Sequence, residues 1–309
     1  MMRLIKMELY RLIHTVSTRV MIVVAAGVAV LMSFVLSVDL ETMEEELRAS
    51  GQETGIESQE PAESFASGFS DGWASVGEES AEEGFTWGIT ASVDESQIGS
   101  DIGMGDILMS ELGGCLLVVF VAIFVPLFVN AEQKRGYIKN IAGQIPRREM
   151  LALSKLPAVA VQVFFLFTAY SIASLVSSAI FFRGRLALDF TGALFRTLCM
   201  QYVLHAAWGC LIALLTIVTR STAFAMTTGI LLASGLVEML MIYLNRVIHV
   251  LLPSSEQFNL MHYTLNYAVE AMTAQSTMRQ IGGFLTLALI YIAASAVIAG
   301  IVYRKRDVR

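Results

Sequence analysis

The residue types that most often carry chemistry are few and scattered in this sequence. The four histidines lie far apart, at His14, His205, His249 and His262. The three cysteines all fall in long apolar runs, at Cys115, Cys199 and Cys210. Neither set has the spacing of a metal site or a disulfide framework. No G-x4-G-K-[ST] phosphate loop, G-x-S-x-G elbow or H-E-x-x-H motif occurs. We therefore predict that the chain is not an enzyme and itself binds no metal or cofactor.

Four polar residues stand inside apolar runs and are the candidates for intramembrane chemistry. They are Gln162, Gln201, His205 and Glu238. The two glutamines and His205 are suited to hydrogen bonds between helices. A carboxylate within a membrane is costly, which makes Glu238 a candidate functional residue. The alternative is that Glu238 meets Arg246 or interfacial water near the outer surface.

Composition indicates the elements that must position these residues. The 309 residues are 55% hydrophobic and 16% charged, with a mean hydropathy of +0.64. A membrane span needs about 20 apolar residues, and buried backbone in lipid must be helical. We predict an all-α polytopic membrane protein with six transmembrane helices and an amphipathic N-terminal interfacial helix. The predicted spans are residues 19–38, 107–130, 156–182, 197–218, 223–244 and 281–303.

Basic residues predict the orientation of these spans. They concentrate before the first span, between spans two and three, and in the tail at 304–309. An even number of spans places all three regions on one side, which the positive-inside rule makes cytoplasmic. We therefore expect a multi-pass plasma-membrane protein with both termini in the cytoplasm.

The leader, residues 1–18, is predicted to be an amphipathic elbow helix in the membrane interface. Its apolar face is formed by Ile5, Leu9, Leu12, Ile13 and Val16, and Glu8 falls on the polar face. The cationic residues assigned to this helix are Arg3, Lys6 and Arg11. The alternative is a basic flank that only fixes the topology.

An acidic segment follows the first span. Residues 39–106 hold eighteen Asp or Glu and one Arg, a charge of −17, which leaves +11 for the rest because the whole chain carries −6. Residues 40–48 are rich in helix formers, so the first span is predicted to continue as a helix toward Gly51. Two interpretations of the segment after Gly51 remain open. It is either a lid that gathers a cationic substrate or a solvated, partly disordered loop.

The basic region between spans two and three, residues 131–155, predicts a helix, a break at Gly143 and a second helix. Glu132, Gly136 and Lys139 form an E-x3-G-x2-K pattern, and Arg148 and Lys155 follow it as R-x6-K. Together with the amphipathic leader, the six spans and the short basic tail, this pattern resembles permease subunits of type-two ATP-binding-cassette exporters. Among these, the chain is most similar to bacterial permeases that export or expel antimicrobial peptides.

The resemblance implies a function and a set of partners. The chain would be a permease that exports or expels a peptide or amphiphile. It would pair with a second permease, in a homodimer or a heterodimer, and would contact membrane lipids and no nucleic acid. ATP and Mg²⁺ would bind on separate cytoplasmic ATPase subunits. The implied coupling residues are Glu132, Lys134, Arg135, Gly136, Lys139, Arg147, Arg148 and Lys155.

Two other classes of protein remain open from the sequence. A secondary transporter driven by an ion gradient would need charged or broken helices near the membrane midplane. A membrane-embedded sensor or scaffold would use the acidic segment as a ligand-binding ectodomain. Residues 245–280 are too polar to span and are predicted to form short helices on, or dipping into, the outer leaflet.

Overall fold

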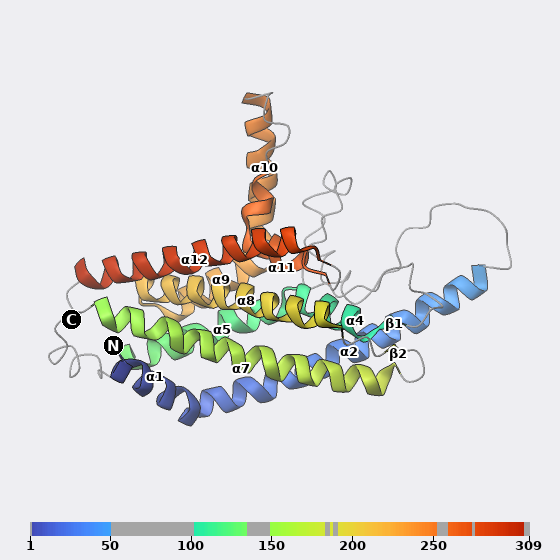
Figure 1. The fold of residues 1–309 in the computed structure, drawn as a ribbon, viewed down its shortest axis with the longest axis horizontal. Helices are drawn as coiled ribbons and strands as arrows, with labels where there is room; N and C mark the ends of the chain where they lie inside the picture. The colour runs from blue at the N-terminus through green and yellow to red at the C-terminus, as the bar shows by residue number, and fades with distance from the viewer. Residues whose placement is uncertain are drawn as a thin grey trace.

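A computed structural model describes residues 2–50, 102–134, 149–182, 186–187, 191–251, 259–273 and 276–305. It is almost entirely helical (Figure 1). The helices are α1 (Met2–His14), α2 (Val16–Ser50), α4 (Met104–Gly113), α5 (Leu116–Lys134), α7 (Glu149–Phe181), α8 (Gly192–Thr219), α9 (Thr222–Ala233), α10 (Leu236–Leu251), the 3-10 turn η4 (Leu260–Tyr263), α11 (Leu265–Glu270) and α12 (Met278–Lys305). Two-residue strands β1 (Ile102–Gly103) and β2 (Leu186–Ala187) pair in parallel.

The predicted helical membrane architecture agrees with this structure at the level of the long helices. Four of them, α2, α7, α8 and α12, are each long and apolar enough to cross a membrane, and the number is up to six if each of two bent pairs is one span. The chain ends described at Met2 and Lys305 lie at the same end of the bundle (Figure 1). Helix α2 continues to Ser50, which confirms the predicted extension beyond the first span.

The second predicted span, 107–130, is broken rather than continuous. Helices α4 and α5 meet at an angle of 50°. The break falls at Gly114 and Cys115, and Cys115 adopts a left-handed conformation with φ 54°. A non-glycine residue at positive φ is costly, so surrounding packing must hold this turn in place.

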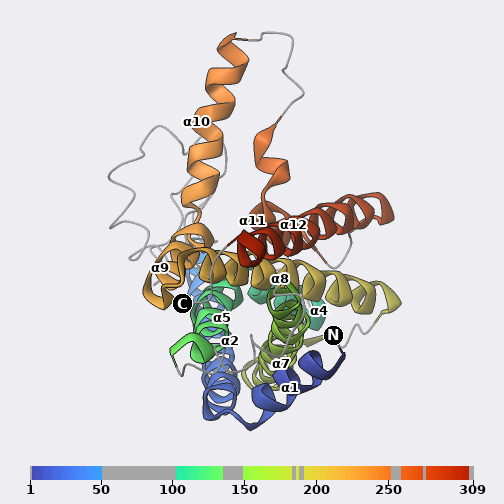
Figure 2. The same ribbon diagram turned by 90° about the vertical axis from the view of Figure 1, so that its left-hand side faces the viewer.

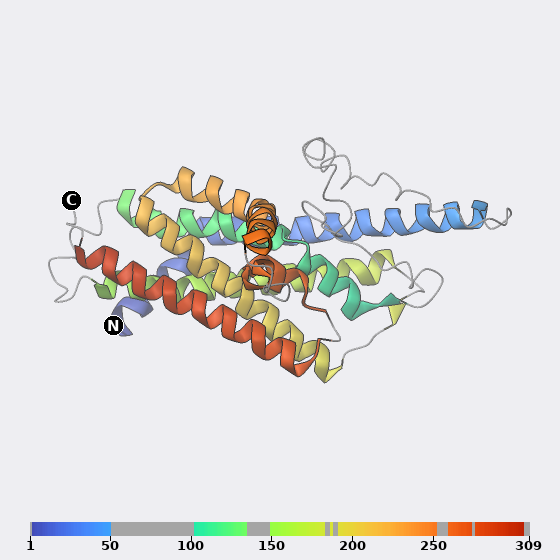
Figure 3. The ribbon, with the colours of Figure 1, turned by 90° about the horizontal axis from the view of Figure 1, so that it is seen from above.

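The fifth predicted span, 223–244, is also broken. Helices α9 and α10 meet at 58°, and Gly235 at the break has φ 86°, which glycine adopts readily. Helix α10 then leaves the bundle and projects away from α12, in the views of both Figure 1 and Figure 2. Seen from above, it is viewed end-on (Figure 3).

Between α10 and α12 the described chain forms η4 and α11, which agrees with the short helices predicted in 245–280. Helix α11 packs against α4 and α8. Its residues Leu265, Ala268 and Val269 are buried in the core. This short helix therefore belongs to the interior of the bundle.

Helix α8 is the most deeply buried of the four long helices, and it packs against α5, α7, α9 and α12. Small residues bring the neighbouring helices close together. A Cβ at Gly229 of α9 would lie 2.8 Å from both Ala122 Cβ of α5 and Ile212 Cδ1 of α8. Such close backbone approach is the usual device for packing helices in membranes.

This contact predicts a stability difference between two glycine substitutions. Gly229→Ala should lower the midpoint of thermal unfolding in detergent, because overpacking costs about 1–3 kcal/mol and outweighs the roughly 1 kcal/mol gain in helix propensity. Gly300→Ala in α12, which has open space around it, should leave the midpoint unchanged or raise it. Equal midpoints for the two variants would contradict the close α5–α9 contact.

Candidate functional site

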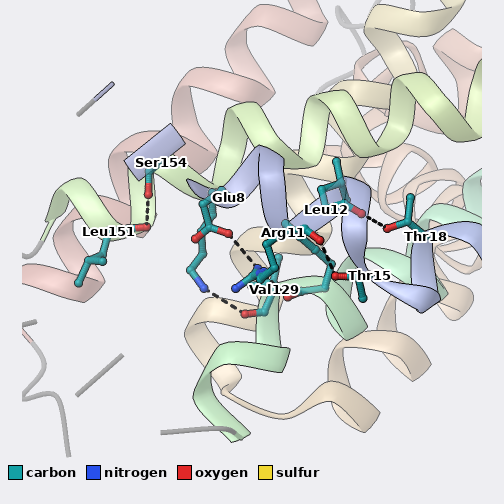
Figure 4. Close-up of polar contacts among 10 residues, drawn as sticks. Glu8, Arg11, Leu12, Thr15, Thr18, Val129, Leu151 and Ser154 are labelled. Carbon is teal, nitrogen blue, oxygen red and sulfur yellow. Dashed lines mark hydrogen bonds and ion pairs between the residues drawn. The ribbon is translucent and has the colours of Figure 1, made fainter. Parts of the chain in front are cut away.

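The candidate site lies where α1, the end of α5 and the start of α7 meet, and we call it the α1–α5–α7 cluster. It consists of Glu8, Arg11, Phe128, Val129 and Lys155. Figure 4 shows Glu8, Arg11 and Val129 of this cluster. The position follows from the sequence: α1 precedes the first span, whereas α5 and α7 flank the predicted coupling region. The cluster therefore joins α1, the predicted elbow helix, to the helices at both ends of that region.

Lys155 is the deepest cation of this cluster. Its side chain is 1% exposed, and Nζ donates a hydrogen bond of 3.1 Å to the Val129 carbonyl. That carbonyl lies near the C-terminal end of α5, where the helix dipole favours positive charge. Lys155 thus ties the start of α7 to the end of α5. Because its ammonium is buried, its contribution to coupling would pass through α5 rather than through direct contact with a partner.

Arg11 makes the matching connection from α1. Its Nη2 donates to the Phe128 carbonyl over 3.3 Å, and its guanidinium lies 4.5 Å from the centre of the Phe128 ring. The same nitrogen is 2.9 Å from Oε2 of Glu8, which is 2% exposed. A carboxylate buried this deeply is tolerated only when its charge is well compensated. The turn into α2 is closed by Thr18, whose hydroxyl donates to the Leu12 carbonyl over 2.6 Å (Figure 4).

The buried face of α1 differs from the predicted apolar face. Leu12 is fully buried, but Ile13 and Val16 are exposed. Glu8, expected on the polar face, is buried instead because α1 packs on α7 and Arg11 pairs with its carboxylate. Arg3 and Lys6 are exposed, as an outer cationic face requires.

Most of the predicted coupling residues lie outside the described residues. These are Arg135, Gly136, Lys139, Arg147 and Arg148. Glu132 and Lys134 fall in the last turn of α5. The structure therefore describes the two helices at the borders of the coupling region, together with Lys155.

The predicted intramembrane glutamines do connect different elements. Gln162 of α7 donates to the Phe124 carbonyl of α5 over 3.1 Å. Gln201 of α8 donates to the Val269 carbonyl of α11 over 3.0 Å. His205 instead bonds within its own helix, with Nδ1 2.7 Å from the Gln201 carbonyl, and packs against Phe167.

Glu238 does not meet Arg246 in the described part of the chain. Its side chain is 1% exposed, and Oε2 accepts a 3.1 Å hydrogen bond from Nδ2 of Asn266 in α11. The residues predicted as intramembrane candidates are thus not brought together at one site. Gln201 of α8 and Glu238 of α10 each form a hydrogen bond with α11.

A further buried polar group, centred on Glu111 of α4, is not among the intramembrane candidates predicted from the sequence. Glu111 is 1% exposed and accepts a 2.7 Å hydrogen bond from Ser33 of α2. Ser177 of α7 donates to Ser33 over 2.7 Å. The available signal was a run of hydroxyl residues at helical spacing, Tyr170, Ser171, Ser174, Ser177 and Ser178.

Comparisons of the chain with protein-family models, with curated proteins and with solved structures find no match. The fold itself defines the class at a coarse level. Its several long apolar helices are those of a membrane-embedded helical protein.

The Glu8–Arg11 pair predicts strong coupling in a double-mutant cycle. Arg11→Met should lower the free energy of unfolding by about 1.5–3 kcal/mol, because it removes one charged hydrogen-bond partner of the buried Glu8 carboxylate. Adding Glu8→Gln should recover part of that loss, giving an interaction energy of about 0.5–3 kcal/mol. The measurement is unfolding in detergent, with Lys6→Met on the exposed face of α1 as the control. Strictly additive effects would show that the two side chains are not coupled.

Proposed function

We propose that this chain is the membrane-spanning permease subunit of a type-two ATP-binding-cassette exporter, moving a peptide or amphiphile. It would work as a dimer of permeases with ATPase subunits on the side that carries both termini. The observation that carries the proposal is the α1–α5–α7 cluster. It links the elbow helix and both borders of the region with the E-x3-G-x2-K and R-x6-K patterns.

The cluster supports a mechanical route from a soluble partner into the membrane. The predicted coupling region, residues 131–155, includes the end of α5 at Lys134 and the start of α7 at Glu149. Lys155 and Arg11 bind neighbouring carbonyls of α5 from α7 and α1. A displacement of the coupling region would therefore move three helices together rather than one.

The intramembrane contacts supply the next step. Helix α7 reaches α5 through Gln162 and packs along α2 and α8. Helix α5 in turn packs closely on α9. Tilting α5 and α7 would change the contacts of α8 and α9, which is how an outward path could open in such a permease.

Charge reversal in the coupling region tests this function. The double variant Lys139→Glu/Arg148→Glu should lose ATP-driven transport and ATPase binding, because two predicted contacts become repulsive. The measurement is co-purification in mild detergent with any soluble ATPase, followed by transport in proteoliposomes. Arg304→Glu/Lys305→Glu, which changes the same charge at the end of α12, is the matched control. Full binding and transport by the first variant, or purification of the chain without any ATPase, would count against the proposal.

A gradient-driven transporter is the second candidate, favoured by one observation. Glu111 and Glu238 are both buried carboxylates in the helical pairs that are broken, and broken helices with acidic groups are a feature of secondary transporters. In that case Glu111→Gln should abolish transport that persists without an ATPase and collapses with the proton gradient. Transport that needs ATP and is insensitive to the gradient would reject this candidate.

A further inference from the structure

Helix α10 runs in a different direction from the helices that can cross a membrane. In Figure 1, α8, α9 and α12 follow the long axis of the bundle, whereas α10 runs across it, and Figure 3 shows α10 end-on beside the length of α8 and α12. The bend between α9 and α10 is 58°. Because the long apolar helices set the direction of the membrane normal, α10 runs closer to the plane of the membrane than to its normal.

The length of α9 gives the level at which α10 begins. Helix α9 starts at Thr222, at the end of the bundle that carries the described chain ends (Figure 3), and has 12 residues. It rises about 18 Å at 1.5 Å per residue, which is less than the roughly 30 Å of hydrocarbon. The other end of the path agrees, because Tyr291 near the middle of α12 donates to the Tyr263 carbonyl of η4, on which α10 packs. Helix α10 therefore lies within the membrane, in the half away from the chain ends.

The side chains of α10 are divided between two faces. At about 100° per residue, Glu238, Asn245 and His249 fall within about 40° of one another on one face. The exposed large apolar side chains fall within about 100° of one another on the opposite face, and we call them the α10 stripe. They are Leu236, Leu240, Tyr243, Leu244 and Val247, and their exposure ranges from 42% to 62%. Such a division is typical of a helix that lies between two environments.

The polar face of α10 is bound to the protein. Glu238 accepts a 3.1 Å hydrogen bond from Asn266 of α11. Asn245 donates through Nδ2 to Asn259 Oδ1 over 3.4 Å, and its own Oδ1 accepts from the backbone N–H of Leu260 over 3.4 Å. These contacts fix the rotation of α10 about its axis. The α10 stripe is therefore held facing away from η4 and α11.

The composition and position of the α10 stripe favour lipid over a second protein helix. Helices that pack together in membranes approach through small residues, as Gly229 does in this chain, but the stripe consists of large side chains. It also continues the exposed apolar surface of α9, where Ile230 and Leu231 precede the bend. Arg246 is exposed at the edge of the stripe, and an arginine in such a place can extend its guanidinium to the lipid headgroups.

We propose that α10 lies in the leaflet opposite the chain ends, along the plane of the membrane, and binds the acyl chains of that leaflet through the α10 stripe. Arg246 extends toward the lipid phosphates. Residues 236–244, predicted as part of the fifth span, then do not cross the membrane, and α9 enters it only part of the way. This inference does not depend on the proposed transport function, since the depth of α10 can be measured on the purified chain without an ATPase.

Nitroxide labels on single cysteines test the depth of α10 in phosphatidylglycerol liposomes. The parent is Cys199→Ser, which removes the exposed cysteine, and its residual signal is subtracted. The labelled variants are Leu236→Cys, Leu240→Cys, Leu244→Cys and Val247→Cys. Depth is measured by electron paramagnetic resonance from collisions with oxygen, which is enriched in lipid, and with a water-soluble nickel chelate. These positions are exposed, so the unfolding midpoints should match that of the parent.

All four labels should collide freely with oxygen and lie at similar depths. The rise from residue 236 to 247 is about 16 Å along the helix axis, and the 58° bend reduces its component along α9 to about 9 Å. The depths should therefore differ by no more than about 9 Å. Labels on exposed positions of α12 are the matched control, because this helix follows the bundle axis. Depth should pass through a maximum along Leu285→Cys, Leu289→Cys, Val297→Cys and Ile301→Cys.

Three results would overturn the proposal, each in favour of a different environment for α10. A depth range nearer to 16 Å than to 9 Å would show that α10 continues the crossing begun by α9. Free collision of all four labels with the nickel chelate would place the α10 stripe in water. Low collision rates with oxygen, together with dipolar broadening between labels on different molecules, would show that a second copy of the chain covers the stripe. Met241→Cys, which faces the packed side of α10 among residues of α8, α11 and α12, gives the oxygen collision rate of a protein-covered position.

Discussion

Two cations at the end of α5, the buried Lys155 and the half-buried Arg11, hold the arrangement on which the rest of the bundle depends. Lys155 and Arg11 donate to the successive carbonyls of Val129 and Phe128. Burying a charge is costly unless it is well hydrogen-bonded, so these contacts constrain α7 and α1 to one position against α5. The helix dipole adds to the attraction, because the C-terminal end of α5 is its negative end. Helix α1 is thereby part of the packed structure rather than only a layer on its surface.

The two broken helical pairs impose a second constraint, and α11 lies against both breaks. A backbone that is interrupted inside a membrane must find partners within the protein. At the α9–α10 break, Asn266 of α11 donates to the Leu232 carbonyl near the end of α9. At the α4–α5 break, Cys115 Sγ lies 3.3 Å from Glu270 Oε1, and Gly113 lies beside the backbone of Val269 and Glu270. Six residues therefore support two turns that come from distant parts of the chain.

The sequence predicted the long helices well because hydropathy over about 20 residues reports burial in lipid directly. It also predicted α1 and the continuation of α2 to Ser50, since both depend on local periodicity and helix propensity. The breaks were not predicted, because glycine is common in membrane helices and the left-handed turn at Cys115 depends on packing by α11.

The candidate site likewise depends on packing between distant segments more than on local sequence patterns. Lys155 is recognisable as a basic residue near a span, but its burial depends on Val129, which is 26 residues earlier in the sequence. Glu8 falls on the polar face of a helical wheel and is buried only because α1 packs on α7. Asn266 gave no signal at all, since its role requires both the end of α9 and the position of Glu238. Long-range partners of this kind are not encoded in local patterns.

Asn266 makes α11 and the α9–α10 break parts of one structure. Its amide nitrogen donates to the Leu232 carbonyl in the terminal turn of α9 and to Glu238 at the start of α10. Asn266 therefore restrains the angle between α9 and α10. Helix α9 packs on α5 through Gly229, and α5 ends at the α1–α5–α7 cluster. A change in the position of α5 would therefore alter the angle between α9 and α10, so the two ends of the bundle would be energetically coupled through α9.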